Sequence, residues 1–226
     1  MIKLEQVTKS YGSGEGETRV LKDIDLEIKS GEFVAIMGPS GSGKSTLLNI
    51  LGALDVPSGG NYSFYDTDIR ALSKEQLALF RRYILGFVFQ GFNLLKKTSA
   101  LENVEMPLVY LGMHAKERKQ RAIEALTSVG LEDRTGYDPG QLSGGQQQRV
   151  AIARAMVTRP KVLIADEPTG NLDSKRGLEI MELIKTFNED GITVIMVTHE
   201  KDIAAYASRI IYLRDGMIEK ESKHVA

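Results

Sequence analysis

A glycine-rich loop between an apolar run and a run of helix formers is the feature that most constrains the fold of this chain. The apolar run covers residues 33–37, and the loop follows it directly. The loop consists of Gly38, Pro39, Ser40, Gly41, Ser42, Gly43, Lys44, Ser45 and Thr46. A strand, a glycine loop and a helix in this order form a loop that binds polyphosphate. The segment therefore predicts an α/β fold that binds a nucleoside triphosphate.

The residue types of this loop explain how it would bind phosphate. Glycines let successive backbone N–H groups turn toward a polyphosphate, and the positive end of the following helix points to the same place. Lys44 adds a full charge that reaches the β- and γ-phosphates, and the Ser45 hydroxyl is placed to coordinate magnesium. The alternative, an ordinary glycine-rich turn, is disfavoured by the strand and helix patterns on either side.

Two carboxylates form a second motif. The apolar run 162–165 ends in Asp166 and Glu167, so both side chains leave the carboxyl end of a buried strand, where α/β sheets bind ligands. Asp166 is predicted to hold the magnesium ion through water, and Glu167 to polarise the water that attacks the γ-phosphate. Taken alone, the pair is better explained as a strand end that starts a loop. Together with the phosphate loop, it favours triphosphate hydrolysis.

The third motif, residues 142–146, has the sequence Leu-Ser-Gly-Gly-Gln and precedes a run of good helix formers. By itself this pattern is a serine cap with a flexible helix entrance. The pentapeptide nevertheless resembles the signature motif of the ATP-binding cassette (ABC) family. Together with the two phosphate motifs, it identifies the chain as a member of that family, and the resemblance covers nearly the whole chain.

The resemblance implies roles for four further residues, each of which alone is more often structural or simply exposed. Tyr11 matches the aromatic residue that stacks on adenine. His199, at the end of an apolar strand, matches the switch histidine that donates a hydrogen bond to the γ-phosphate. Gln90 matches the glutamine that links the two subdomains, and Asp173 lies in the aspartate loop after Glu167.

By the same resemblance, two copies of the chain bind two ATP molecules head to tail. The opposite subunit closes each site with Ser143, Gly144, Gly145, Gln146 and Asp173. The implied magnesium ligands are Ser45, Gln90 and Asp166. The implied catalytic residues are Lys44, Gln90, Glu167 and His199. ATP joins the two subunits, hydrolysis releases them, and the cycle drives a transmembrane permease.

Four passages look like one subgroup of the family: macrolide exporters, lipoprotein-releasing ATPases and the cell-division ATPase that partners a membrane protein. They are residues 20–24, 87–95, 100–107 and 165–173. The subgroup implies a peripheral location on the cytoplasmic side of the inner membrane, with membrane contact only through the partner. The chain departs from its relatives at Lys96-Lys97, where many carry proline.

An ABC-superfamily ATPase that acts on nucleic acid or the ribosome is the alternative function. It would carry two cassettes or a coiled-coil insertion, and the sequence has neither. A phosphate-loop kinase would fit the first motif but not the signature segment.

Composition agrees with the transport interpretation. A formal net charge of -1 gives no basic footprint for nucleic acid and no polybasic membrane patch. The sequence has no cysteine and no stretch near the roughly 20 apolar residues of a membrane span. Its first residues do not form a signal peptide. We therefore expect a protein that is soluble by itself.

The order of patterns predicts one domain over residues 1–226. An α/β core with an N-terminal antiparallel β region covers 1–92 and 158–226, and a helical subdomain is inserted at 93–157. Pro107 is predicted to break one of the inserted helices. Asp215-Gly216 is predicted to turn a terminal hairpin. Residues 219–226 carry no folding signal.

Overall fold

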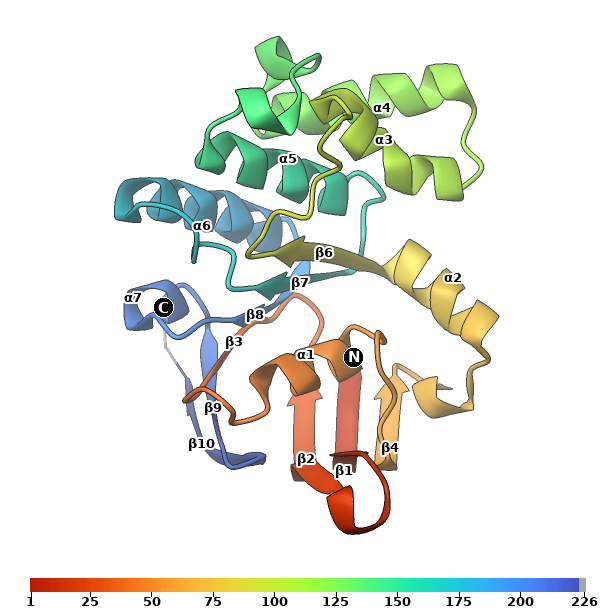
Figure 1. The fold of residues 1–226 in the computed structure, drawn as a ribbon, viewed down its shortest axis with the longest axis vertical. Coiled ribbons are helices and arrows are strands. Elements are labelled where there is room, and N and C mark those ends of the chain that lie inside the picture. The colour runs from red at the N-terminus through yellow and green to blue at the C-terminus, as the bar shows by residue number, and fades with distance from the viewer. Residues whose placement is uncertain (224–226) are drawn as a thin grey trace. The chain divides into compact units, whose positions relative to one another are not determined.

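The computed structural model describes residues 1–223 and divides into two compact units. The first unit comprises Met1–Arg81 together with the chain from Thr193 onward, and the second comprises Arg82–Ile192 (Figure 1). The predicted α/β fold is confirmed. These boundaries differ from the predicted ones, 93 and 157. The second unit contains the inserted helices and also the strands at 85–89 and 162–166 and the helix at 174–189.

An antiparallel sheet in the first unit has the strand order β2-β1-β4-β5. Its strands are β1 (Ile2–Tyr11), β2 (Thr18–Ile28), β4 (Gly59–Phe64) and β5 (Thr67–Asp68). Ile2 pairs with Ile28 and Leu4 with Leu26, and all four side chains are buried. The alternating apolar residues therefore lie on one face of the sheet, as the sequence pattern predicts. The loop between β1 and β2 contains a single 3-10 turn, Gly14–Gly16.

The remaining strands of the first unit are arranged β10-β9-β3-β8. They are β3 (Phe33–Met37), β8 (Thr193–Val197), β9 (Arg209–Arg214) and β10 (Met217–Lys223). β3 pairs in parallel with β8 and β9, and all five of its residues are buried. Burial on both faces explains why β3 is apolar without alternation. The helices that begin in this unit are α1 (Lys44–Leu51), η2 (Ile69–Ala71), α2 (Lys74–Ile84) and α7 (Lys201–Ala204).

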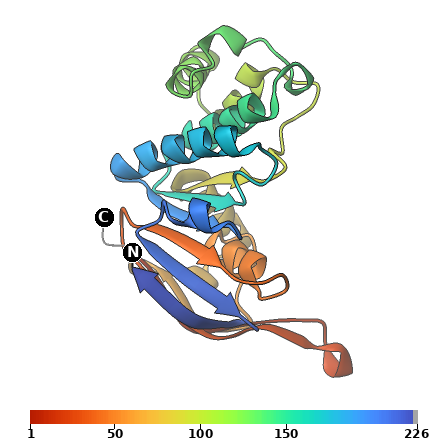
Figure 2. The same ribbon diagram turned by 90° about the vertical axis from the view of Figure 1, so that its left-hand side faces the viewer.

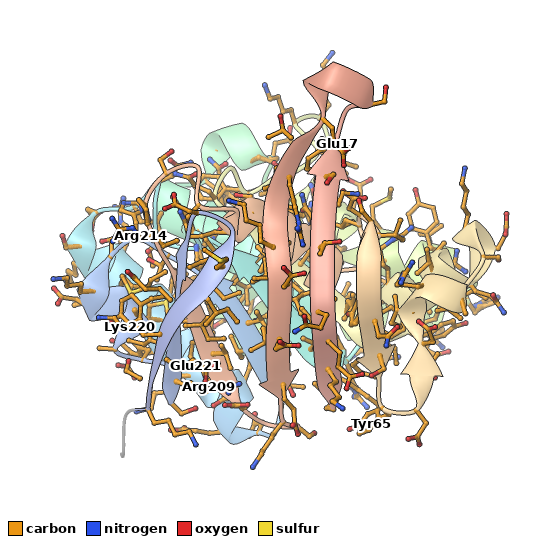
Figure 3. The ribbon with its side chains drawn as sticks, turned by 90° about the horizontal axis from the view of Figure 1, so that it is seen from below. Glu17, Tyr65, Arg209, Arg214, Lys220 and Glu221 are labelled. Carbon is orange, nitrogen blue, oxygen red and sulfur yellow. The ribbon has the colours of Figure 1, made fainter. Side chains whose placement is uncertain are left out.

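The strand β10 corrects one expectation. Residues 219–226 were predicted to carry no folding signal. For residues 219–223 this prediction was wrong, because they belong to β10, which pairs antiparallel with β9. It is an edge strand with mostly exposed side chains, so its sequence is charged rather than apolar. Arg209 of β9 forms an ion pair with Glu221 of β10 at 3.3 Å, and the two lie together in Figure 3. Residues 224–226 lie outside the described part.

The second unit combines two parallel strands with four helices (Figure 2). The strands are β6 (Leu85–Phe89) and β7 (Val162–Asp166), and the helices are α3 (Ala100–Tyr110), α4 (Ala115–Ser128), α5 (Gly144–Met156) and α6 (Ser174–Glu189). Short 3-10 turns η3 (Glu132–Arg134) and η4 (Pro139–Gln141) precede α5. Helices α3, α4 and α5 contact one another, and α5 also contacts β6. Four consecutive residues, Val150 to Ala153, are buried, so this part of α5 is enclosed around its whole circumference.

Pro107 does not break a helix, which is the second correction. It lies inside α3, which continues to Tyr110. Proline removes one intrahelical N–H donor, yet the carbonyl of Pro107 still accepts from the N–H of Leu111 at 3.2 Å. Val104 and Leu108 are buried on either side of it. Packing therefore holds the last turn in place despite the missing hydrogen bond.

Among residues 1–223, no helix combines the length and the apolar character needed to cross a membrane.

Candidate nucleotide-binding site

The loop before α1 follows a backbone path that requires glycine at two positions. Gly38 has φ 156°, and a Cβ atom there would lie 2.1 Å from the carbonyl oxygen of Leu213. Gly43 has φ 99°, and its Cβ would lie 2.8 Å from a methyl group of Leu21. Any larger residue at either position would press against β9 or β2. Gly38 and Gly43 are thus required by the way the loop packs against β9 and β2.

The N-terminus of α1 has no capping side chain. Its N-cap residue is Gly43 in the left-handed conformation, and its first turn holds no acidic residue. Ser45 is exposed and Thr46 is half-buried in this turn. Because no side chain caps the first N–H groups and no carboxylate offsets the helix dipole, this end of α1 is suited to an anion.

One side chain of the loop is suited to a polyphosphate. The Lys44 ammonium donates to the carbonyl oxygens of Gly38 and Pro39, both at 2.9 Å, so it curls over the loop. Ser42 is only 2% exposed and belongs to the packing of the loop. The loop therefore brings a cation next to the positive end of α1, and both favour a polyphosphate.

The first unit also carries Tyr11 and His199. Tyr11 is the last residue of β1, is 43% exposed, and donates its O–H to Asp55 Oδ2 at 2.8 Å. His199 follows β8 and is exposed. Thr198, between the end of β8 and His199, is buried, and its hydroxyl accepts from the N–H of Glu200 at 3.1 Å. That bond fixes the backbone on both sides of His199.

The second unit brings Gln90, Asp166 and Glu167 together. Phe89 pairs with Asp166 where β6 and β7 run in parallel, so Gln90 and Glu167 leave the same edge of the strand pair. Glu167 has φ 44°, a left-handed value that is uncommon for a residue with a side chain. The Asn171 amide donates to the carbonyl oxygen of Gln90 at 2.9 Å. The turn after β7 is therefore tied to the end of β6.

The signature segment lies at the start of α5 with its helix end already capped. The Ser143 hydroxyl accepts from the N–H of Gln146 at 3.4 Å, and the Gln146 side chain accepts from the N–H of Ser143 at 2.9 Å. Gly145 is buried, and a Cβ there would lie 3.2 Å from the Arg176 side chain. Asp173 caps α6 by accepting from the N–H of Arg176 at 3.0 Å. Arg176 thus connects the signature and the aspartate loop, both of which the sequence singled out.

Sequence reasoning missed Asp55 and Arg176. Asp55 lies 44 residues from Tyr11, and no local pattern marks the pair. Arg176 follows Asp173 by three residues, which is the spacing of a helix cap, but its contact with Gly145 depends on how α5 and α6 pack. Only the tertiary structure shows either role.

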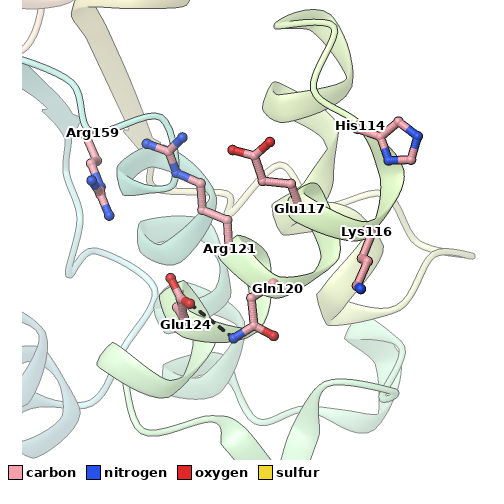
Figure 4. Close-up of a pocket in the computed structure, with 7 residues that line it drawn as sticks. All are labelled: His114, Lys116, Glu117, Gln120, Arg121, Glu124 and Arg159. Atoms are coloured by element: carbon pink, nitrogen blue, oxygen red, sulfur yellow. Dashed lines mark hydrogen bonds between the residues drawn. The ribbon is translucent and has the colours of Figure 1, made fainter.

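A separate cavity of about 670 Å³ lies along α4. Figure 4 shows it lined by side chains of that helix with His114 and Arg159. Its acidic and basic groups are mixed, and none of the predicted site residues lines it. Most of its lining residues are exposed, as on a solvated helix face. Among residues 1–223, no group of three or more histidine, aspartate or glutamate side chains gathers as a ready-made metal site.

Comparison with known proteins gives the same assignment as the geometry. The ABC transporter family matches residues 21–170. An uncharacterized ABC transporter ATP-binding protein of Methanocaldococcus jannaschii is 55% identical over 218 residues, which are 96% of this chain and 97% of that protein. The macrolide export ATP-binding/permease protein MacB of Azoarcus sp. is 53% identical over 218 residues, 96% of this chain but only 33% of MacB.

A solved structure agrees over the full length. It is the dimeric, post-hydrolysis state of the ATP-binding cassette MJ0796, bound to ADP and phosphate. The match has a TM-score of 0.92 and 50% identity, and it covers 100% of both chains.

The fold and the phosphate loop define a nucleotide-binding ATPase of the phosphate-loop class. The chain belongs to the ABC transporter family and is one of its ATP-hydrolysing components, which use ATP with Mg²⁺.

Proposed function

We propose that this chain is the motor of an export or lipoprotein-release system, in which two copies bind two Mg-ATP and drive a membrane permease. The observation that carries the nucleotide-binding part of the proposal is the N-terminus of α1. It has no capping side chain, and it follows a loop in which Gly38 and Gly43 are required. The relatives support the rest. MJ0796 was solved as a dimer with ADP and phosphate, and MacB joins an ATP-binding part to a permease.

The first unit would hold the nucleotide. Lys44 and the loop N–H groups would bind the phosphates, and Tyr11 would stack on the adenine. Ser45 would supply a hydroxyl ligand to magnesium, with Gln90 and Asp166 as further oxygen ligands, a donor set that suits this ion. When bound, magnesium neutralises charge on the phosphate oxygens.

The hydrolytic step would be carried by Glu167, which orients water and accepts its proton. The left-handed backbone at Glu167 is a fixed conformation, since the following turn is closed by the N–H of Gly170 donating to the Glu167 carbonyl at 3.1 Å. His199 would donate to the γ-phosphate oxygen that gains charge. The partner subunit would complete the site with its signature segment and its aspartate loop.

The location follows from the partner. Because the driving event is a change in a permease, the chain would sit at the cytoplasmic side of the membrane and reach it only through that permease. A balanced charge gives no footprint for nucleic acid, so no observation favours action on DNA or the ribosome.

Glu167→Gln tests the proposal, because it keeps the size and hydrogen bonding of the side chain and removes the base. ATP should still bind, turnover should fall about 10²- to 10⁴-fold, and an ATP-bound dimer should accumulate. Size-exclusion chromatography with Mg-ATP and a phosphate-release assay measure both. Glu179→Gln, on the exposed side of α6, is the matched control. A variant that stays monomeric and hydrolyses ATP at the parent rate would overturn the assignment.

A further inference from the structure

In the first unit, Tyr11 forms a cluster with two residues that the sequence motifs do not include, Lys9 and Asp55. Lys9 of β1 is 8% exposed, and its ammonium lies 2.6 Å from Asp55 Oδ1. It also donates to the carbonyl oxygen of Val56 at 2.9 Å. A buried ammonium is retained only with such partners. The ion pair therefore fixes the loop after α1 to strand β1.

Asp55 is the centre of the cluster. Its carboxylate accepts from the Lys9 ammonium, from the Tyr11 hydroxyl at 2.8 Å and from the N–H of Val56 at 2.7 Å. Burial raises the pKa of Asp55, but these three hydrogen bonds outweigh burial and hold its pKa below the usual value. The carboxylate is therefore charged at neutral pH and able to hold the phenol of Tyr11.

The ring of Tyr11 contacts the side chain of Lys9. The Lys9 ammonium lies over it, 4.9 Å from the ring centroid, which is a cation-π contact. Burial and the hydrogen bond to Asp55 raise the pKa of Tyr11. The phenol is thus tied to the loop after α1, while Tyr11 remains 43% exposed.

We propose that Lys9 and Asp55 are positioning residues that lock Tyr11 as a platform for the base of the nucleotide. The inference rests on the proposed function, in which Tyr11 stacks on adenine. A ring that is already fixed loses no rotamer freedom when the base binds, so its orientation contributes to affinity. Neither residue needs to touch the nucleotide.

The test compares two ligands that share the phosphates and differ in the base: ATP and inorganic tripolyphosphate, both without magnesium so that nothing is hydrolysed. Asp55→Ala releases the ring, and it should weaken ATP binding about threefold to tenfold while tripolyphosphate binding stays unchanged. Tyr11→Phe, which keeps the ring and leaves the ion pair intact, should weaken ATP binding by a smaller factor. In a Tyr11→Ala background, Asp55→Ala should add nothing. Isothermal titration calorimetry gives each affinity.

Asp25→Ala is the matched control, because Asp25 also accepts hydrogen bonds from β1, through Gln6. It should leave both ligands unaffected. If Asp55→Ala does not fold, as a melting curve would show, the affinity of Tyr11→Phe for ATP is the remaining test. An affinity equal to that of the parent would overturn the positioning role.

Each other outcome separates the two ideas. If Tyr11→Ala weakens ATP binding but Asp55→Ala and Tyr11→Phe do not, the positioning role is wrong and the stacking role stands. If Tyr11→Ala leaves ATP binding unchanged, the stacking role fails and the positioning role with it. If Asp55→Ala weakens tripolyphosphate as much as ATP, Asp55 acts on the phosphate loop rather than through Tyr11.

Discussion

Helices α1 and α5 both begin with glycine-rich segments, yet their N-termini differ. The first turn of α1 has Gly43 as its N-cap and no side chain that satisfies its N–H groups. The first turn of α5 is closed by reciprocal hydrogen bonds between Ser143 and Gln146. An uncapped N-terminus gains most from an anion, whereas a capped one has already satisfied some of its donors. We propose that the N-terminus of α1 binds phosphate by itself, and that the N-terminus of α5 contributes only when it meets a phosphate already bound to another subunit.

Loss of the Lys44 charge is expected to have the largest effect. Lys44→Ala should reduce hydrolysis by roughly 10² or more and weaken nucleotide binding, because a cation facing the phosphates is lost. The thermal shift with Mg-ATP should shrink in parallel, since a ligand stabilises only the state that it binds. Lys74→Ala, an exposed lysine in the first turn of α2, is the control. A melting shift equal to that of the parent would contradict the role of α1.

A second variant separates capping from catalysis at α5. Ser143→Ala removes an N-cap and should cost about 1 kcal/mol of unfolding free energy. It should also lower hydrolysis at saturating ATP while leaving the affinity of the monomer for ATP unchanged. Urea denaturation, a phosphate-release assay and calorimetry provide the three values.

Ser99→Ala is the matched control, because Ser99 and Glu102 form the same capping box at the start of α3. It should cost a similar free energy of unfolding and leave hydrolysis unchanged. Equal losses of hydrolysis in the two variants would mean that Ser143 acts only by stabilising a helix.

The smallest expected effect is a difference in how the free energy of unfolding depends on acid pH for the capping boxes of α3 and α5. The hydrogen bond from the Ser99 side chain, followed by the one from its backbone, lowers the pKa of Glu102 from its ordinary value of 4.5. A carboxylate with a lowered folded-state pKa adds stability above its unfolded pKa, and that stability is lost as the pH falls through the folded value. The α5 box has glutamine in this place and does not titrate.

At pH 6, Glu102→Gln should have a lower free energy of unfolding than the parent. The difference between the two free energies should shrink as the pH falls through the titration of the Glu102 carboxyl group. Urea denaturation across this range is the measurement. A difference that is constant with pH would show that Glu102 makes no charge-dependent contribution.

Features that depend on local sequence were predictable. The apolar run of β3, the glycine loop and the serine cap of α5 each depend on residues close together in the sequence, so the pattern alone indicates them. Pro107 and β10 were not predictable in this way. Packing around α3 outweighs the intrinsic effect of proline, and pairing with β9 forms an edge strand from charged residues.

The site shows the same division. The residues of the phosphate loop, the carboxylate pair and the signature could be named from motifs, and their roles stay predictions. Asp55 could not be named, because it meets Tyr11 only through the packing of β1 beside the loop after α1. Contacts between residues that are distant in the sequence were the part of the site that the motifs could not predict.

The central claim is that α1 of one copy and α5 of another serve the same phosphate, and a mixing experiment tests it most directly. Lys44→Ala damages only the α1 side and Ser143→Arg only the α5 side, so each variant alone makes dimers with two damaged sites. A mixed dimer has one site with both defects and one with none. Hydrolysis should therefore rise and then fall as one variant is titrated into the other. Baseline hydrolysis at every ratio, with mixed dimers shown to form, would contradict the claim.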